Sequence, residues 1–387
     1  MHLVWINELA HGKGGTERYV GDTAARLRER GVRSTLLYDV RSPVDPEYLS
    51  LFDGAYPQVD RPRQLRELAP DALYVHRVDE GDAILELASA GVPVLRFFHD
   101  YKIFCLREHK YTAIGQETCR RTIGVGCYAC LGFVQRAASG PSPVKLVSVA
   151  SLRRAQRRNQ GLTAHAVGST YMREHLAAHG FDRAKIHVLP LYAEAPPEAL
   201  PGPREPELVL FVGQLIRGKG LDLLLRALAQ TWTRARLLVA GEGNQRGELE
   251  ALSRSLGLGA RVTFAGRIAP AELPALHARA RCLAMPSRYP ETFGLAGIEA
   301  LASGLPVIAS DVGGIREWLE DGENGILVPS GDVGALTRAL DRLVLDDALA
   351  AAMGRRAQAT HRARFLPEHH LGRLHALLRR LTGEEAT

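Results

Sequence analysis

The sequence predicts an α/β protein built on two doubly wound parallel sheets, one in each half of the chain. Apolar runs of strand length alternate with segments of helical period through almost the whole sequence. The alternation pauses in one proline-rich stretch, residues 191–207, and then starts again. The length of 387 residues is too great for a single core, so two domains joined by this linker are expected.

The first half, residues 1–190, reads as a series of strand–helix–strand units. Leu3 to Ile6 forms the first strand, a glycine-rich loop follows, and a helix runs from about Thr16 to Arg30, where Gly31 ends it. The strand STLLY comes next. The unit repeats in DALYVHR, AILELASAG and PVLRFF, and again in TAHAVGS and MREHLAAHG. Such a series implies a parallel sheet with helices on both faces.

The second half repeats the pattern over residues 208–366. The predicted strands are ELVLFVG, RLLVAG, RVTFAG, RCLAMP, PVIASD and ILVP, with helices between them. A final amphipathic helix is expected within residues 367–387. Two such domains leave a cleft lined by the carboxyl ends of both sheets, which is where open α/β sheets bind ligands.

The segment PETFGLAGIEALASG contains two glutamates, Glu291 and Glu299, among small and apolar residues. A helix is expected to start near Phe293, so that the amides of Phe293, Gly294 and Leu295 point toward an anion at the helix start. A diphosphate bound there would have one glutamate on each flank, and each glutamate would accept hydrogen bonds from sugar hydroxyls. The alternative is that Glu291 caps the helix and Glu299 is solvated.

A second loop, GQLIRGKG, lies directly between a strand and a helix and carries Gly213, Gly218, Lys219 and Gly220. A lysine in such a loop is a point charge suited to a diphosphate, and the glycines allow the backbone to approach it. The loop is not a P-loop, because a glycine follows the lysine where that motif has serine or threonine. The signal gains weight only in combination with the two glutamates.

Together these segments resemble a known family. The second half is similar to the nucleotide-sugar-binding domain of family-4 retaining glycosyltransferases, which have the GT-B architecture of two facing Rossmann-like domains. The N-terminal half matches more loosely, through GGTER and through His99-Asp100. The matching segments of the second half are Val212 to Gly220, VAGEG, FAGRI, PETFGLAGIE and GLPVIASDVGGIRE.

The resemblance implies roles for individual residues of the second half. Glu291 would hold hydroxyls of the transferred sugar, Glu299 would hold the ribose, and Lys219 would bind the diphosphate. Many family members carry arginine directly after the first glycine of the phosphate loop, where this chain has Gln214. Arg217 is then expected to supply the second cation.

The resemblance also implies contacts to the base and from the first domain. Gly266, Arg267 and Ile268 would contact the base through the main chain. Gly15 would approach the phosphates, and His99 would reach the donor sugar. Without the resemblance, His99 would be interpreted as a strand-end histidine bonded to the backbone, and Gly15 as part of a flexible turn.

The reaction implied by the resemblance is transfer of a hexosyl group from a nucleoside diphosphate sugar, with retention at the anomeric carbon. The acceptor would be a hydroxyl of a glycan, a lipid-linked sugar or a small molecule, and no cofactor would be required for catalysis. One alternative is a catalytically impaired carbohydrate- or nucleotide-sugar-binding protein of the same fold. Another is a phosphorylase or epimerase on that fold.

Four of the five cysteines, Cys105, Cys119, Cys127 and Cys130, crowd into one segment of the first half. The C-x-x-C pair at 127 and 130 suits a tetrahedral structural zinc better than disulfides in a cytosolic protein. Cys105 and Cys119 do not form a second such pair, so reduced thiols are the alternative.

The net charge of +6 and the pI near 9.1 favour acidic partners. No nucleic-acid motif accompanies the charge, and no run of eighteen apolar residues or basic leader occurs, so a cytoplasmic location is expected. The segment Val144 to Gln160 is predicted as a helix that rests on anionic lipid at the inner face of a membrane, or else as a solvated face. Its cations are Lys145, Arg153, Arg154, Arg157 and Arg158, and its apolar positions are Leu146, Val149 and Leu152.

Overall fold

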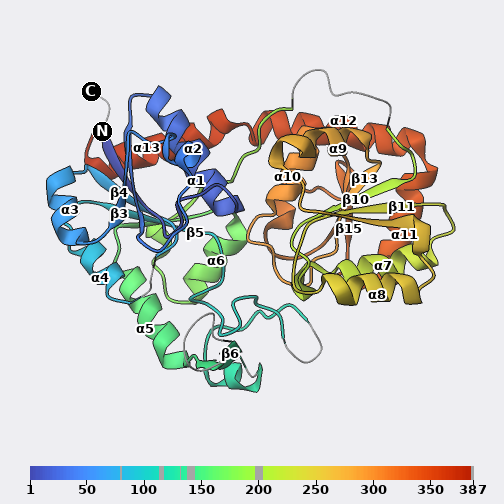
Figure 1. The fold of residues 1–387 in the computed structure, drawn as a ribbon, viewed down its shortest axis with the longest axis horizontal. Coiled ribbons are helices and arrows are strands. Elements are labelled where there is room, and N and C mark those ends of the chain that lie inside the picture. The colour runs from blue at the N-terminus through green and yellow to red at the C-terminus, as the bar shows by residue number, and fades with distance from the viewer. Residues whose placement is uncertain (79–80, 113–116, 131, 137–143, 197–203, 385–387) are drawn as a thin grey trace. The chain divides into compact units, whose positions relative to one another are not determined.

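The computed structural model describes residues 1–387 except 79–80, 113–116, 131, 137–143, 197–203 and 385–387. The chain divides into two compact units. Unit 1 comprises residues 1–108, 121–190 and 368–387, and unit 2 comprises residues 109–120 and 191–367. Part of the predicted linker, residues 197–203, lies outside the described residues. Each unit is built on one parallel sheet with helices on both faces (Figure 1).

Unit 1 contains a seven-stranded parallel sheet in the order β3-β2-β1-β4-β5-β8-β9. The strand order reverses between β1 and β4, because the chain winds outward from β1 in one direction and from β4 in the other. The carboxyl ends of these two central strands therefore mark the place where a doubly wound sheet binds ligands. The strands are β1 (His2–Ile6), β2 (Arg33–Asp39), β3 (Gly54–Gln58), β4 (Ala72–Val75), β5 (Val94–Phe98), β8 (Ala164–Val167) and β9 (Ile186–Val188).

The helices of unit 1 connect these strands in the predicted alternation. Central strands are buried on both faces: Leu3 to Ile6 of β1 is fully buried, as the unbroken apolar run predicts for a parallel sheet. The connecting helices are α1 (Gly15–Glu29), α2 (Pro46–Leu49), α3 (Arg61–Leu68), α4 (Ala83–Ala88), α5 (Val149–Gln160) and α6 (Thr170–Ala178).

Unit 2 contains a six-stranded parallel sheet in the order β12-β11-β10-β13-β14-β15. Its order reverses between β10 and β13, so the loops after these two strands meet at the carboxyl edge. Both sheets are parallel and doubly wound, which confirms the predicted α/β class. The strands are β10 (Leu208–Val212), β11 (Arg236–Ala240), β12 (Val262–Gly266), β13 (Cys282–Met285), β14 (Val307–Ser310) and β15 (Gly325–Val328).

The core of unit 2 forms where α7 (Leu221–Gln230) and α11 (Val333–Leu345) cover the sheet. Leu224, Leu225 and Leu228 of α7 are fully buried against apolar side chains of the strands and of α11. This packing fixes the start of α7, and so the end of the loop after β10. The remaining helices of the unit are α8 (Arg246–Ser255), α9 (Leu273–Arg279), α10 (Leu295–Ala302) and α12 (Asp347–Arg364).

The last helix, α13 (Pro367–Thr382), belongs almost entirely to unit 1, although it follows unit 2 in the sequence. His370 explains this docking. Its Nδ1 lies 2.8 Å from the carbonyl oxygen of Pro190, and its Nε2 lies 2.8 Å from the hydroxyl of Tyr19. The final helix is therefore a structural part of the first domain.

The segment predicted as one helix from Val144 to Gln160 is a helix only from Val149. Val144–Leu146 forms the short strand β7, which pairs in an antiparallel hairpin with β6 (Val134–Arg136). Ser148 is the N-cap of α5, where its side chain accepts a hydrogen bond from the amide of Ser151 at 3.0 Å. The serine ends the strand and starts the helix, a cap signal that apolar periodicity does not reveal.

Candidate active site

The loop after β10 and the loop after β13 pack backbone against backbone at the carboxyl edge of the unit 2 sheet. Gly220 closes the first loop with φ of 69°, and a Cβ at this position would lie 2.0 Å from the carbonyl oxygen of Pro286. Only glycine satisfies both the left-handed backbone and the close approach. Glycine at position 220, where a P-loop would have serine or threonine, is therefore required by this packing.

This packing brings two predicted residues from the two loops together. Nζ of Lys219 lies 2.9 Å from Oε1 and 3.2 Å from Oε2 of Glu291. The Glu291 carboxylate also accepts hydrogen bonds from the Ser287 hydroxyl at 2.6 Å and from the Tyr289 hydroxyl at 2.9 Å. The side chain of Glu291 is 5% exposed and that of Lys219 is 21% exposed. The buried carboxylate thus accepts hydrogen bonds from three donors, which offset the free-energy cost of removing it from water.

Lys219 remains a cation in this setting. Burial alone would lower its pKa, but the charge of Glu291 and the nearby Tyr289 hydroxyl raise the pKa above its usual value. The ammonium group also lies 5.0 Å from the centroid of the Tyr289 ring. Burial, followed by the charge of Glu291, raises the pKa of Tyr289 in turn, so its hydroxyl stays protonated and donates to the carboxylate.

Arg288 and Asp222 support the loop predicted to bind phosphate, residues 213–220 (the phosphate loop), and were missed by the sequence prediction. Their side chains form a bidentate ion pair with N–O distances of 2.5 and 2.6 Å, and the arginine side chain is almost fully buried. Arg288 also donates from Nη1 to the Arg217 carbonyl at 3.2 Å and from its backbone amide to the Gly218 carbonyl at 2.8 Å. The pair ties the loop after β13 to the loop that carries Lys219. An arginine in the loop after a buried strand was the only available sequence signal.

Two tyrosines enclose the middle of the phosphate loop. A Cβ at Gly218 would lie 3.0 Å from the Tyr289 ring and 3.3 Å from the Tyr111 ring. Tyr111 lies in residues 109–120, which belong to unit 2 although their neighbours in the sequence belong to unit 1. The Thr118 hydroxyl anchors this segment by donating to the Arg288 carbonyl at 3.1 Å.

The helix expected to start near Phe293 starts at Leu295, as α10. Gly294 is its N-cap with φ of 94°, and the Phe293 carbonyl accepts a hydrogen bond from Nε1 of Trp318 at 2.7 Å. A Cβ at Gly294 would lie 3.3 Å from the same indole, so packing also requires glycine here. Glu299 is half-buried in the second turn of α10.

The remaining predicted donor residues lie at loop positions of unit 2. Gly266 ends β12 with φ of 75°, and its carbonyl accepts from the amide of Gly241 at 2.7 Å. Arg267 is exposed and Ile268 is half-buried. Arg217 is exposed within the phosphate loop, so its guanidinium is accessible to a ligand.

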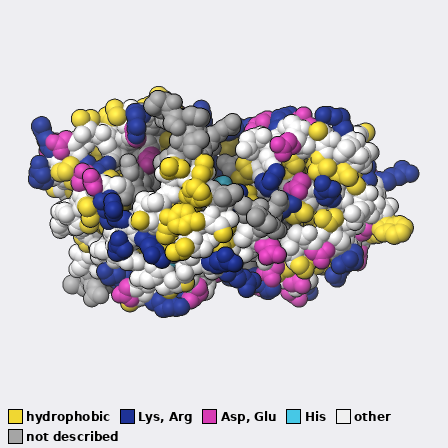
Figure 2. All heavy atoms as spheres, turned by 90° about the horizontal axis from the view of Figure 1, so that it is seen from below, with side chains coloured by type: hydrophobic (Ala, Val, Ile, Leu, Met, Phe, Trp, Pro, Cys, Tyr) yellow, Lys and Arg dark blue, Asp and Glu magenta, His cyan; other side chains and the backbone are white. Residues whose placement is uncertain are grey.

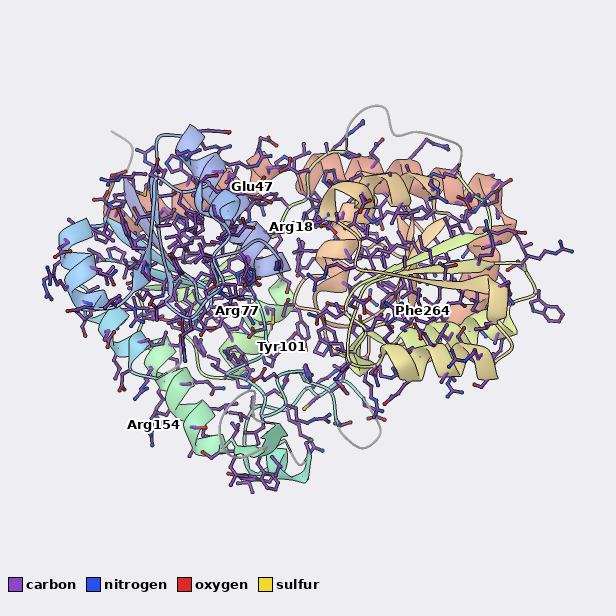
Figure 3. The ribbon with its side chains drawn as sticks, viewed as in Figure 1. Arg18, Glu47, Arg77, Tyr101, Arg154 and Phe264 are labelled. Atoms are coloured by element: carbon purple, nitrogen blue, oxygen red, sulfur yellow. The ribbon has the colours of Figure 1, made fainter. Side chains whose placement is uncertain are left out.

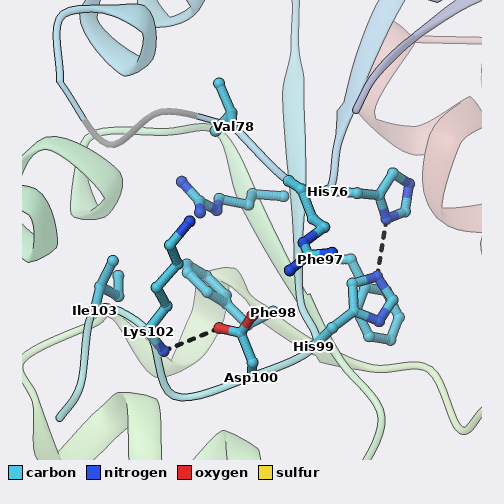
Figure 4. Close-up of a pocket in the computed structure, with 10 residues that line it drawn as sticks. His76, Val78, Phe97, Phe98, His99, Asp100, Lys102 and Ile103 are labelled. Atoms are coloured by element: carbon cyan, nitrogen blue, oxygen red, sulfur yellow. Dashed lines mark hydrogen bonds between the residues drawn. The ribbon is translucent and has the colours of Figure 1, made fainter. Parts of the chain in front are cut away.

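In unit 1, His99 follows β5 and lines a pocket at the carboxyl edge of the sheet (Figure 4). Its Nε2 lies 2.9 Å from Nδ1 of His76, which follows β4, and its ring stacks on Phe97 at 4.3 Å. Burial, followed by the charge of Arg77, lowers the pKa of His99 to about 3. His99 is therefore a neutral hydrogen-bonding group.

The same pocket is rich in cationic side chains. Arg77, Arg96 and Lys102 line it, and Asp100 is the one carboxylate among its lining residues. Arg77 (Figure 3) also pairs at 3.2 Å with the buried carboxylate of Glu17. The predicted residue Gly15 is exposed at the first position of α1, the helix that carries Glu17.

The predicted zinc site consists of four cysteines of the segment from Cys105 to Cys130. All four cysteines of the segment are free and half-buried. Cys119 belongs to unit 2, whereas Cys105, Cys127 and Cys130 belong to unit 1. Across the part of the chain that the structure describes, no three His, Cys, Asp or Glu side chains are placed to hold a metal ion. The zinc site therefore stays a prediction, and no chemistry is assigned to it.

Comparison with known proteins identifies similar sequences. Residues 193–360 match the family described as glycosyl transferases group 1. The chain is 36% identical over 189 residues to the D-inositol 3-phosphate glycosyltransferase of Corynebacterium jeikeium, covering 46% of this chain and 45% of that protein. Identity to the Mycobacterium avium enzyme of the same name is 36% over 230 residues, or 56% and 54% of the two chains. The matching part thus spans about half the length of these curated relatives.

Solved structures extend the likeness to the whole fold. Anabaena HepE, solved in complex with UDP and glucose, superposes with a TM-score of 0.74 at 19% identity over 98% of this chain and all of that one. Sucrose-phosphate synthase from Thermosynechococcus elongatus gives a TM-score of 0.70 at 22% identity over 99% and 100% of the chains. The likeness covers both units and confirms the predicted GT-B fold.

Proposed function

We propose that this chain, whose residues 193–360 match the glycosyl transferases group 1 family, is a glycosyltransferase that uses a nucleoside diphosphate sugar as donor. The observation that carries the proposal is the ion pair between Lys219 and Glu291. It lies where the strand order of the unit 2 sheet reverses, between β10 and β13. It combines a cation for a diphosphate with a carboxylate for sugar hydroxyls.

The proposed donor contacts follow from these positions. Lys219 binds the diphosphate, Glu291 accepts hydrogen bonds from hydroxyls of the transferred sugar, and Glu299 accepts them from the ribose. Because Lys219 and Glu291 are paired in the free protein, a donor binds by exchanging part of this ion pair for its own phosphate and hydroxyl groups. The remaining proposed contacts are Arg217 and the amides of Phe293, Gly294 and Leu295 to the phosphates, and Gly266, Arg267 and Ile268 to the base.

Unit 1 is proposed to bind the acceptor and to complete the donor site. Gly15 approaches the phosphates, and His99, held neutral, forms a hydrogen bond to the donor sugar. The cations Arg77 and Lys102 beside His99 favour an acceptor with an anionic group. The relatives named for D-inositol 3-phosphate make a phosphorylated polyol the first acceptor to test.

The proposed reaction transfers a hexosyl group with retention at the anomeric carbon. The bond between the anomeric carbon and the diphosphate oxygen breaks, and a bond from the acceptor oxygen to that carbon forms on the same face. The acceptor proton passes to the departing diphosphate. The protein holds donor and acceptor in register, and Lys219 stabilises the charge that develops on the leaving group.

None of the helices among the described residues is long and apolar enough to cross a membrane. The proposed location is the cytoplasm, with peripheral contact between the basic helix α5 and anionic lipid at the inner face of the membrane. That contact is separate from the transfer reaction, because its residues lie outside the proposed donor site.

A thermal-shift screen with UDP, GDP, ADP and their sugars tests the donor class, because a ligand that binds only the folded state raises the melting temperature. UDP-glucose is the first donor to test, since HepE was solved with UDP and glucose. Product formation from inositol phosphate, followed by proton coupling at the anomeric position, then tests transfer and retention. A stable protein that no nucleotide protects would contradict the proposal. Protection without transfer would support a binding protein, and a reaction that needs orthophosphate would support a phosphorylase.

A further inference from the structure

A long segment, nearly all of it in unit 1, carries only positive charge. Between Thr118 and Arg173 the sequence has no aspartate or glutamate, although the whole chain has 43. An even distribution would put about six acidic residues there. The segment contains nine lysine and arginine residues. Its local charge is therefore much more positive than the chain average.

Apolar side chains are exposed within the same segment. Val134 and Leu146 stand directly opposite each other across the β6–β7 hairpin, and both are exposed, Leu146 to 75%. The 3-10 helix η1 (Val125–Cys130) adds Val125, which is 79% exposed, and Tyr128. These are four of the eleven large exposed hydrophobic residues identified across the described ranges. Figure 2 shows hydrophobic side chains gathered on this face, with Lys and Arg side chains beside them.

The exposed group rests on a small core of its own. Leu106, Ile123, Val149 and Leu152 are buried together, and Phe133 packs against them. The apolar positions of α5 therefore face the protein, contrary to the expectation that they contribute to a lipid-binding face. Leu146 is the exception, because it lies on the hairpin.

Arginines border the exposed apolar group. Nη2 of Arg153 donates to the Ile123 carbonyl at 3.4 Å, which holds the guanidinium beside η1. Nη1 of Arg121 lies 3.8 Å from the position that a Cβ on Gly126 of η1 would occupy. Arg154 (Figure 3) and Arg157 are exposed farther along α5. Among the described residues, no carboxylate forms an ion pair with Arg153, Arg154 or Arg157.

We propose that this surface, defined by Val125, Tyr128, Val134 and Leu146 with Arg121, Arg153, Arg154 and Arg157, docks on an anionic lipid bilayer. The four apolar side chains enter the boundary between headgroups and acyl chains, and the arginines bind lipid phosphates. The hydroxyl of Tyr128 accepts a hydrogen bond from the Val149 amide at 3.4 Å, so its exposed ring enters this boundary without leaving the hydroxyl unpaired. The proposal goes beyond the predicted contact of α5 alone, because side chains outside that helix supply the apolar part.

The apolar group distinguishes a bilayer from other polyanions. A nucleic acid would bind the arginines but offers no apolar layer for two aliphatic side chains on a hairpin, and its binding to a single strand relies on several stacked aromatic rings. Tyr128 is the one exposed aromatic residue of the group. The combination of aliphatic and cationic side chains therefore favours lipid.

Sedimentation of the full chain with vesicles tests the apolar part. We expect binding to phosphatidylcholine vesicles containing phosphatidylglycerol and little binding to phosphatidylcholine alone. The double variant Val134→Ser/Leu146→Ser should bind at least about tenfold more weakly, since two side chains no longer enter the lipid. The matched control Val40→Ser/Val59→Ser removes two exposed valines elsewhere in unit 1 and should bind like wild type. Equal binding of both double variants would overturn the insertion.

Charge is tested by a second matched pair of variants. Three arginine-to-glutamine changes on α5 should reduce binding to the anionic vesicles severalfold more than three on unit 2, although both change the net charge equally. Rising salt should weaken wild-type binding, because surface charges are screened. Binding to RNA or to an acidic protein without binding to vesicles would overturn the proposal. The α5 positions are Arg153, Arg154 and Arg157, and the control positions, also exposed, are Arg226, Arg254 and Arg338.

A tryptophan probe locates the inserted residues. Lipids brominated on their acyl chains should quench the tryptophan fluorescence that the Val125→Trp variant adds. They should not quench the fluorescence of Trp232, which is 94% exposed in unit 2. Quenching confined to Trp232 would contradict the assignment. Transfer to a soluble acceptor should be unchanged in every variant, so a failure of membrane docking is distinct from a failure of the proposed transferase function.

Discussion

Separating Lys219 from Glu291 should affect both stability and transfer, and by different amounts. At the observed N–O distance of 2.9 Å, an effective dielectric constant of about 20 gives an attraction of roughly 6 kcal/mol, before the desolvation of both ions is subtracted. Lys219→Met leaves a carboxylate that is 5% exposed with only the Ser287 and Tyr289 hydroxyls as donors. We expect a loss of about 3 kcal/mol in the free energy of unfolding.

Replacing Glu291 instead of Lys219 should lower the free energy of unfolding by less. Glu291→Gln keeps an oxygen for Ser287 and Tyr289, and Lys219 is 21% exposed and can bind water instead. We therefore expect a loss of about 2 kcal/mol, and a double variant about as stable as the worse single one, which gives a coupling energy near 2 kcal/mol.

Urea denaturation of the wild type, the two single variants and the double variant measures the four free energies of unfolding that this double-mutant cycle needs. Initial rates of transfer at saturating donor give the second readout, and Lys219→Met should lower kcat about 10²-fold, as loss of one charge-stabilising group does. Additive losses of stability would refute the ion pair in the free protein. A wild-type rate in the lysine variant would refute the diphosphate role, whatever its stability.

Three further predictions concern the surroundings of the site and the unit 1 core. Arg288→Lys should weaken nucleoside diphosphate binding about tenfold by calorimetry, because lysine cannot reproduce the bidentate pair with Asp222; unchanged affinity would contradict its support of the phosphate loop. Glu299→Ala should weaken binding of the nucleoside diphosphate itself, whereas Glu291→Ala should impair transfer and leave that binding nearly intact; the opposite order in calorimetry would reverse the two roles. His165, whose ring nitrogens lack hydrogen-bond partners, has a pKa lowered by burial and then by a nearby arginine to about 3, so stability is full above pH 6.5 and falls as the pH drops toward 3. In the wild type, protonation of His165 in the unfolded state should lower the free energy of unfolding by about 2 kcal/mol between pH 7 and pH 5. The His165→Leu variant should lack this decrease, and a variant with the same pH dependence as the wild type would refute this cause.

The sequence predicts much of the fold and singles out both members of the Lys219–Glu291 pair, because these features depend on short-range patterns. Strands such as β1 are buried on both faces, so their apolar runs stand out, and helices end at glycines such as Gly31. Lys219 and Glu291 were identified because each lies in a short loop after a buried strand. That these loops adjoin follows from the reversal of strand order between β10 and β13.

Other features depend on contacts between distant parts of the chain and leave little trace in sequence patterns. The partner of Arg288 lies 66 positions earlier, and the docking of α13 depends on contacts of His370 with Tyr19 and Pro190. Strand β7 was predicted as part of a helix because its three residues are too few to show alternation. Leu146 was therefore placed on the wrong element.

The path of the chain between the units has a consequence for building chimeric enzymes. The chain passes from one unit to the other after residues 108, 120, 190 and 367, so a cut in the proline-rich linker does not release either unit intact. A fragment that starts at residue 191 loses Tyr111 and Thr118, which contact the phosphate loop and the Arg288 carbonyl. A fragment that stops at residue 190 loses α13. A recombinant protein designed to acquire another donor preference must therefore exchange residues 109–120 together with 191–367, and keep the terminal helix with the first half.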